Sequence, residues 1–174
     1  MTITEGQTLL KCDQLNTPQP RVWFDLGCGS GLFSEALIGL LPKGSMIYAI
    51  DKQPTTFNSK EIEFIKLDFV RDTLPKVSSD GILMANSLHY VKDKLQFLIK
   101  IKKHLLPNGV FLLVEYDTET SNPWVPYPIS FLSAKDLFRQ AGFRAGDKIN
   151  TKPSSFNNGI IYSAIFYNDV NINT

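Results

Sequence analysis

The chain has 174 residues, of which 43% are hydrophobic and 20% are charged, a mixture typical of a single globular domain. Such a composition excludes disordered, fibrous and coiled-coil proteins. The 18 lysines and arginines nearly balance the 17 aspartates and glutamates, so the net charge is +1. This balance supplies no strong field for nucleic acid or for an anionic membrane and disfavours both as partners.

Targeting and cross-linking signals are absent from the sequence. The first twenty residues lack the basic and then apolar pattern of a signal peptide. No apolar run approaches the ~20 residues that span a bilayer. The two cysteines, Cys12 and Cys28, have no CxxC or Cys/His spacing, and no metal-ligand cluster is visible. We therefore expect a cytoplasmic protein without a metal site or a membrane segment.

Strand-like and helix-like patterns alternate along the first half of the chain. A strand at residues 21–26 leads into a glycine-rich turn at 27–31. The apolar spacing after this turn predicts a helix that begins at Leu32 and ends before Pro42. Further strands are predicted at residues 46–51, 62–69 and 81–85.

The second half keeps this rhythm. Apolar residues at helical spacing between Leu95 and Leu106 predict a helix that ends at Pro107–Gly109 and is followed by a strand at 110–115. Ser133 and Asp136 resemble a capping box that begins a helix through Ala141. The tail predicts a hairpin of strands at 147–151 and 159–167, of which at least one runs antiparallel to the main sheet.

Two links between predicted strands are unusually short. Residues 52–61 and 70–79 each provide about ten residues, whereas a full βαβ crossover needs a dozen or more. We therefore expect shortened crossover helices. The predicted fold is α/β and Rossmann-like: a doubly wound, mostly parallel seven-stranded sheet with an antiparallel C-terminal strand. Residues 1–174 would form one domain, with a short N-terminal extension at 1–20 and a core at 21–167.

The strongest local signal is the sequence DLGCGSG at residues 25–31, located at a strand-to-helix turn. Its glycines allow backbone N–H groups to approach a ligand at the start of a helix. The third position of a dinucleotide GxGxxG motif is Leu32, and no Walker A lysine follows. Asp51 ends the next predicted strand, where a carboxylate can accept hydrogen bonds from ribose hydroxyls. Asp68 lies near the end of the third.

Together these motifs resemble those of the class I S-adenosylmethionine-dependent methyltransferases. The resemblance covers residues 20–143 and includes VWFDLGCGSG, YAID, IKLDF, SSDGILMANSLHYVKDK and LLPNGVFLLVEYD. It implies that S-adenosylmethionine is the cofactor and S-adenosylhomocysteine the product. The residues that it implies in cofactor binding are Asp25, Gly27, Cys28, Gly29, Asp51, Lys52, Asp68, Phe69, Asn86 and Ser87.

The fourth-strand segment resembles the branch of this family that acts on small molecules. There His89 is the first candidate for a catalytic base or substrate contact, and Tyr90 is the second. An alternative for His89 is a wall of the pocket without a catalytic role. The Asn/Asp-Pro-Pro-Tyr/Phe motif of enzymes that methylate planar amines is absent, since this strand continues as NSLHY.

The proline-rich stretch 122–128 follows the fifth predicted strand. Trp124 and Tyr127 on this loop are candidates for substrate binding, because aromatic side chains supply large contact areas. The alternative is a linker whose aromatic residues pack on the core. The short N-terminal segment is too small for a separate lid domain, which favours a shallow pocket or one completed by a partner. A homodimer is one arrangement that the sequence allows.

The sequence therefore predicts methyl transfer to an oxygen, nitrogen or carbon of a small molecule, by in-line displacement at the sulfonium methyl group. Two alternatives stay open. One is a cofactor-binding protein that has lost catalysis, and the other is an RNA or protein methyltransferase. The sequence leaves the methyl acceptor and the oligomeric state undetermined.

Overall fold

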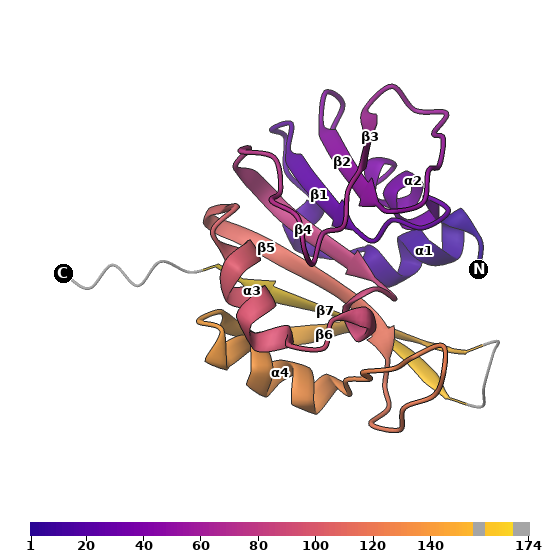
Figure 1. The fold of residues 1–174 in the computed structure, drawn as a ribbon. Helices are drawn as coiled ribbons and strands as arrows, with labels where there is room; N and C mark the ends of the chain where they lie inside the picture. Colours follow the sequence, from indigo (N-terminus) through magenta and orange to yellow (C-terminus); the bar gives the residue numbers. More distant parts are fainter. Residues whose placement is uncertain (155–158, 169–174) are drawn as a thin grey trace.

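The computed structural model describes residues 1–154 and 159–168. Their central feature is a seven-stranded sheet with the order β3-β2-β1-β4-β5-β7-β6 (Figure 1). The strands are β1 (Val22–Leu26), β2 (Met46–Asp51), β3 (Ile62–Lys66), β4 (Ser79–Ala85), β5 (Leu105–Tyr116), β6 (Arg144–Pro153) and β7 (Ile160–Tyr167).

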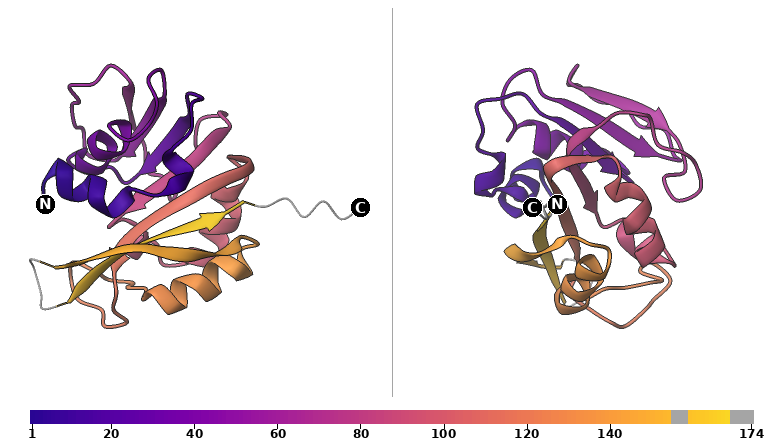
Figure 2. Two further views of the ribbon diagram at one scale, coloured as in Figure 1. Left: turned by 180° about the vertical axis from the view of Figure 1, so that it is seen from behind. Right: turned by 90° about the vertical axis from the view of Figure 1, so that its left-hand side faces the viewer.

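Helices cover both faces of this sheet. Apolar side chains of α1 (Ile3–Leu10) and α2 (Leu32–Ile38) pack in one core, and those of α3 (Lys94–Lys102) and α4 (Phe131–Gln140) pack in the other. The turned views in Figure 2 show α1 on the side of the sheet opposite to α3. Two single-turn 3-10 helices, η1 (Asp13–Leu15) and η2 (Leu88–Tyr90), complete the described elements. No helix in residues 1–154 and 159–168 is both long and apolar enough to cross a membrane.

Strands β1 to β5 run parallel, whereas β7 is antiparallel to its neighbours β5 and β6. The predicted fold class is therefore confirmed, including the antiparallel C-terminal strand. Because the carboxyl ends of the parallel strands meet at one edge, the loops after β1, β2, β3, β4 and β5 all open there.

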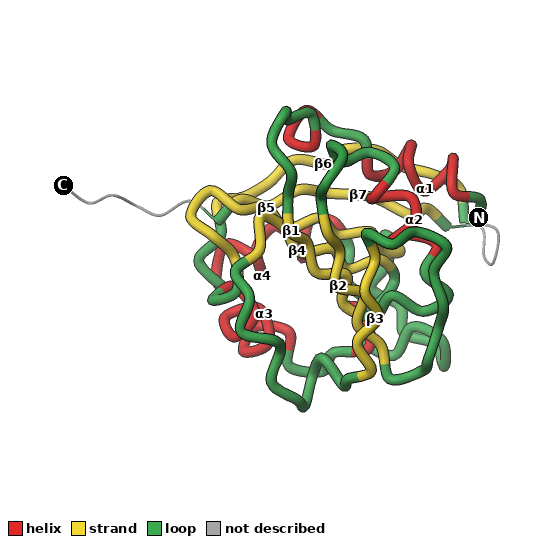
Figure 3. The backbone as a smooth tube through the Cα atoms, turned by 90° about the horizontal axis from the view of Figure 1, so that it is seen from above, coloured by secondary structure: helices red, strands yellow, loops and turns green. Residues whose placement is uncertain are grey.

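The two links flanking β3 contain no helix at all, whereas the sequence predicts shortened crossover helices. Figure 3 shows them as long loops beside β2 and β3. The second link is anchored to the core by Leu74, which is only 1% exposed. Loops thus flank this end of the sheet, where α2 also packs against β2 and β3.

The N-terminal segment is more ordered than the sequence predicts. Thr2 and Glu5 form a capping box that begins α1. Glu5 forms an ion pair with Lys152 on β6, with 2.6 Å between Oε1 and Nζ. The side-chain Nδ2 of Asn150 on the same strand donates to the Thr8 carbonyl. Helix α1 is therefore fixed to the edge of the sheet.

Several predicted boundaries are wrong, including the start of β5, which lies at Leu105 and not at residue 110. Helix α3 ends at Lys102, well before Pro107, because the backbone after it pairs with the sheet: the Ser79 amide donates to the His104 carbonyl. Strand β3 ends at Lys66, because the Asp68 carboxylate accepts the next amides and forms a turn. Helix α4 begins after Ser130, which caps it through the Ser133 amide.

The closing hairpin is confirmed and is longer than predicted on its first strand, which covers Arg144–Pro153. Part of its predicted turn, residues 155–158, lies outside the described residues.

Candidate functional site

A cavity of about 770 Å³ opens at the carboxyl edge of the parallel strands. Its size lies within the range of small-molecule sites in proteins. The cavity wall brings together most of the sequence-predicted site residues, namely Gly27, Cys28, Gly29, Asp51, Lys52, Asp68, Phe69, Asn86, Ser87, Tyr90 and Tyr127. Asp25, His89 and Trp124 are not among its lining residues.

The glycine-rich turn forms one wall of this cavity. Gly27 has a left-handed φ of 81°, and a Cβ there would lie 2.6 Å from the Ser87 Cβ, so glycine is required for this packing. Gly29 differs, because it has a φ of 54° and a Cβ on it would meet no protein atom within 4 Å. The backbone of Gly29 thus faces open space, as a site for a closely bound ligand requires.

Cys28 lies between these glycines and is buried. Burial and the neighbouring carboxylates of Asp25 and Asp51 raise the pKa of its thiol. The thiol therefore stays protonated and offers a small apolar surface to the cavity.

Asp51 ends β2 and joins two loops. Its Oδ2 accepts the Gly29 amide at 2.9 Å, and its Oδ1 accepts the Gln53 amide at 2.9 Å. Each carboxylate oxygen can accept a further hydrogen bond. The side chain is thus held in place while it remains able to bind hydroxyl groups.

Asp25 lies behind the turn and is 1% exposed. Its Oδ2 accepts the Ser34 hydroxyl at 2.5 Å, whereas its Oδ1 is buried without a partner among the described residues. Burial, opposed by the Ser34 hydrogen bond and assisted by the charge of Asp51, raises the pKa of Asp25 to about 7. The side chain therefore links β1 to α2 behind the turn and does not line the cavity.

Asp68 and Phe69 follow β3 at the far end of the cavity. The carboxylate of Asp68 accepts the amides of Val70 and Arg71, and Lys52 lies 3.7 Å from it. Partial burial acts in the opposite direction, but these hydrogen bonds and cations together lower the pKa of Asp68. Phe69 is 7% exposed and packs against Phe97 in the core.

Asn86 and Ser87 follow β4 at the centre of the cavity. Asn86 adopts a left-handed φ of 52°, which asparagine tolerates better than most residues. Its Oδ1 is buried without a hydrogen-bond partner in the described part of the chain. Ser87 donates its hydroxyl hydrogen bond to the Leu26 carbonyl at 2.6 Å, which ties β4 to β1. The orphaned Asn86 oxygen is therefore an acceptor that a ligand could satisfy.

His89 is buried directly behind the cavity wall. Its Nδ1 lies 2.7 Å from Glu115 Oε2, and the two side chains are 2% and 1% exposed. The imidazole centroid lies 4.3 Å from the Tyr90 ring and 6.1 Å from the Tyr116 ring, and both tyrosines line the cavity. The structure thus places Tyr90 at the wall and His89 one side chain deeper.

Several wall residues were not predicted from the sequence. Lys92, Tyr116 and Ile161 line the part of the cavity beyond β4, and Met1, which precedes α1, also lines the cavity. Tyr116 ends β5, so the topology rule that places ligands at the carboxyl ends of strands could have identified it. The partnership of Glu115 with His89 leaves no local sequence signal, because Glu115 lies in β5 and His89 lies in η2 after the neighbouring strand β4.

The loop at 117–130 carries both aromatic residues predicted to bind substrate, but only Tyr127 faces the cavity. Tyr127 lines the cavity, and its amide donates to the His89 carbonyl at 3.0 Å. Trp124 is 80% exposed, because the turn at Asn122–Val125 directs it to solvent and not into the cavity or the core.

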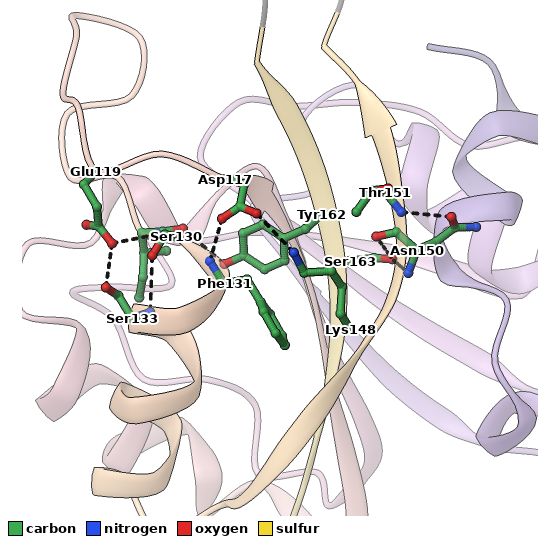
Figure 4. Close-up of polar contacts among 11 residues, drawn as sticks. Asp117, Glu119, Ser130, Phe131, Ser133, Lys148, Asn150, Thr151, Tyr162 and Ser163 are labelled. Carbon is green, nitrogen blue, oxygen red and sulfur yellow. Dashed lines mark hydrogen bonds and ion pairs between the residues drawn. The ribbon is translucent and has the colours of Figure 1, made fainter.

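The start of this loop is anchored to α4 and β6 (Figure 4). Asp117 accepts the Phe131 amide and forms an ion pair with Lys148 at 3.1 Å. Glu119 accepts the hydroxyl of Ser133. The base of the loop is therefore fixed beside the cavity.

A family model described as "Methyltransferase domain" matches residues 24–111, just over half of the 174 residues. Among curated proteins, the ubiquinone biosynthesis O-methyltransferase of Rickettsia conorii is 26% identical over 98 residues, which cover 51% of this chain and 32% of that protein. The trans-aconitate 2-methyltransferase of Acidovorax sp. is 26% identical over 101 residues, covering 56% of this chain and 39% of that protein. The match thus spans well under half the length of either relative.

Two examples illustrate the solved structures that share this fold. The 1,6-didemethyltoxoflavin-N1-methyltransferase of Burkholderia thailandensis, with bound S-adenosylhomocysteine, aligns with a TM-score of 0.76 at 16% identity over 97% of this chain and 78% of that chain. Human N-acetylserotonin methyltransferase aligns with a TM-score of 0.68 at 21% identity over 95% of this chain and 52% of that chain. The family match, the sheet order and the glycine-rich turn agree, and the chain belongs to the methyltransferase domain family, with the Rossmann-like fold of class I S-adenosylmethionine-dependent methyltransferases.

Proposed function

We propose that this protein binds S-adenosylmethionine and transfers its methyl group to a small molecule. One observation carries the proposal: a single cavity joins the open face of Gly29, the carboxylate of Asp51 and Asn86, whose buried amide oxygen has no hydrogen-bond partner among the described residues. Gly29 would let the cofactor approach the backbone, Asp51 would bind the ribose hydroxyls, and Asn86 would bind the ammonium group. Asp68 and Phe69, at the far end, would contact the adenine.

When bound, the cofactor supplies a methyl group whose bond to sulfur breaks, with the electron pair going to sulfur, as the lone pair of the acceptor forms the new bond to carbon. The chain has three tasks in such a reaction. It binds both molecules in one cavity, and it holds the nucleophile in line with the bond between the methyl carbon and sulfur. It also accepts a proton where the nucleophile carries one.

We assign the proton-accepting role to His89, whose imidazole lies behind the rings of Tyr90 and Tyr116, so the proton would have to pass between these rings from the cavity. A carboxylate accepts hydrogen bonds, so Glu115 keeps the imidazole hydrogen on Nδ1 and leaves Nε2 with its lone pair. Nε2 has no hydrogen-bond partner among residues 1–154 and 159–168. Tyr90, which contacts the imidazole and lines the cavity, would touch the acceptor itself.

A small acceptor is supported by the relatives. The curated matches are a ubiquinone biosynthesis O-methyltransferase and a trans-aconitate 2-methyltransferase, and one structural match binds 1,6-didemethyltoxoflavin. The near-neutral charge of the chain also gives no support to an RNA substrate.

Transfer of radiolabelled methyl groups tests the proposal. The purified protein is incubated with labelled S-adenosylmethionine and, separately, with the small-molecule fraction, the RNA and the protein of a cell extract. We expect label in the small-molecule fraction only. Tight cofactor binding without transfer to any fraction would favour a catalytically silent protein, and label in RNA or protein would replace the small-molecule assignment.

A further inference from the structure

The cavity has two chemically different halves along the edge of the sheet. One half lies over β1, β2 and β3 and contains the glycine-rich turn, Asp51 and Asp68. The other half lies beyond β4, where Tyr90, Lys92 and Tyr116 line the wall together with Tyr127 and Ile161. If the cofactor occupies the first half, the second half is left for the acceptor.

Hydrogen-bond donors line this second half. The hydroxyl groups of Tyr90, Tyr116 and Tyr127 make no hydrogen bond within the described residues, and neither does the ammonium group of Lys92. Burial and the nearby carboxylate of Glu115 raise the pKa of Tyr116, so its hydroxyl keeps its proton and remains a donor. Four donors on one wall are therefore available to a ligand.

No carboxylate of the described residues balances these donors on the same wall. The cavity-lining carboxylates, Asp51 and Asp68, belong to the first half and already accept backbone amides. Glu115 lies behind the wall and accepts both the amide and the Nδ1 hydrogen of His89. The neighbouring cation, Lys94, donates to the Val91 carbonyl and lies over the ring of Tyr127, so it adds positive charge from behind.

We propose that the methyl acceptor is a small organic anion, whose carboxylate or phenolate oxygens are bound by Lys92 and by the three tyrosine hydroxyls. Charge-assisted hydrogen bonds to such oxygens are about twice as strong as neutral ones, and the tyrosine rings add apolar contact to a flat molecule. Lys92 is thus a specificity-determining residue. This inference rests on the proposed function, because it identifies the acceptor half by placing the cofactor in the other half.

The first test needs no knowledge of the acceptor. A small-molecule cell extract is passed over a strong anion-exchange resin at low salt, and the flow-through and the salt eluate are desalted. Each is then incubated with the protein and labelled S-adenosylmethionine. We expect the methyl-acceptor activity in the salt eluate. Activity confined to the flow-through would overturn the anionic acceptor and leave the methyltransferase assignment intact, whereas no transfer from the unfractionated extract would overturn the proposed function itself.

The second test examines Lys92 with the active fraction as the acceptor. Lys92→Gln removes the charge and keeps most of the side-chain length, and Lys103→Gln on the exposed end of α3 is the matched control. We expect Lys92→Gln to raise the apparent KM for the acceptor at least tenfold, with kcat and the affinity for S-adenosylhomocysteine unchanged. A KM equal to that of the control variant would show that Lys92 is only a solvated surface residue and would overturn its assigned role.

Discussion

The carboxylate of Glu115 holds His89 at two points: Oε1 accepts its backbone amide at 3.1 Å and Oε2 lies 2.7 Å from its Nδ1. His89 follows β4 and Glu115 lies in β5, so the pair joins two neighbouring parallel strands at the edge that carries the cavity. The double contact fixes the direction of the imidazole as well as the position of its hydrogen.

Replacing Glu115 with glutamine should therefore impair turnover more than binding. A glutamine amide has only one acceptor oxygen, so it can replace only one of the two contacts that Glu115 makes with His89. General-base catalysis typically contributes about 10²–10⁴ in rate. We expect kcat for methyl transfer to fall at least about 100-fold, with little change in the affinity for S-adenosylhomocysteine. Glu63→Gln, on the exposed side of β3, is the control. An unchanged kcat in Glu115→Gln would contradict the assigned role of the pair.

Asp51→Ala should weaken cofactor binding. The substitution removes the proposed charge-assisted bonds to the ribose and also the anchor of the Gly29 amide. We expect a loss of more than about 1 kcal/mol in binding free energy, measured by calorimetric titration with S-adenosylhomocysteine. Asp136→Ala, an exposed residue of α4 paired with Arg139, is the control. Equal affinities in the two variants would show that the cofactor lies elsewhere.

Gly29→Asn should weaken cofactor binding without affecting the folding of the chain. Asparagine tolerates the left-handed φ of 54°, and its Cβ would meet no protein atom within 4 Å, so the folded chain should accept it. The side chain would project into the space assigned to the cofactor. We expect nearly unchanged thermal stability and at least tenfold weaker cofactor binding, whereas Gly44→Asn, at another left-handed glycine outside the cavity, should bind normally. Normal cofactor binding by Gly29→Asn would refute the placement of the cofactor against the glycine-rich turn.

Asp25 should make the stability depend on pH in an unusual direction. Its pKa is raised from 3.8 to about 7, so between these values the unfolded chain releases a proton that the folded chain retains. Stability therefore falls as pH rises through this window. Asp25→Asn removes this titration, while its amide oxygen can still accept the Ser34 hydroxyl. Thermal melts from pH 4 to pH 7 should show the variant gaining stability relative to the native chain, and a constant difference would contradict the assignment.

The fold was predictable because its signals are local. The apolar runs of β2 and β4, the glycine-rich turn and the shortness of the links around β3 each follow from residues adjacent in sequence. Helix α1 was missed, although Thr2 and Glu5 have capping-box spacing. The predicted end of α3 was too late, because the segment from Leu105 onward pairs with β4 and forms the start of β5. Asn108 takes a left-handed φ of 63° within this strand.

The candidate site was only partly predictable, because it depends on contacts between strands. Residues of the glycine-rich turn and Asp51 could be placed from the topology rule alone. The burial of His89 against Glu115 depends on the register of β4 and β5, and the solvent exposure of Trp124 depends on the turn at Asn122–Val125. Neither relationship is visible in a single sequence.

The central claim is that the glycine-rich turn, Asp51 and Asn86 bind S-adenosylmethionine, and calorimetric titration of the purified protein tests it most directly. S-adenosylmethionine, S-adenosylhomocysteine and NAD are titrated in parallel. We expect the first two to bind with a Kd on the order of micromolar, about −8 kcal/mol, and NAD to show no binding. No binding of the first two, or a preference for NAD, would contradict the account.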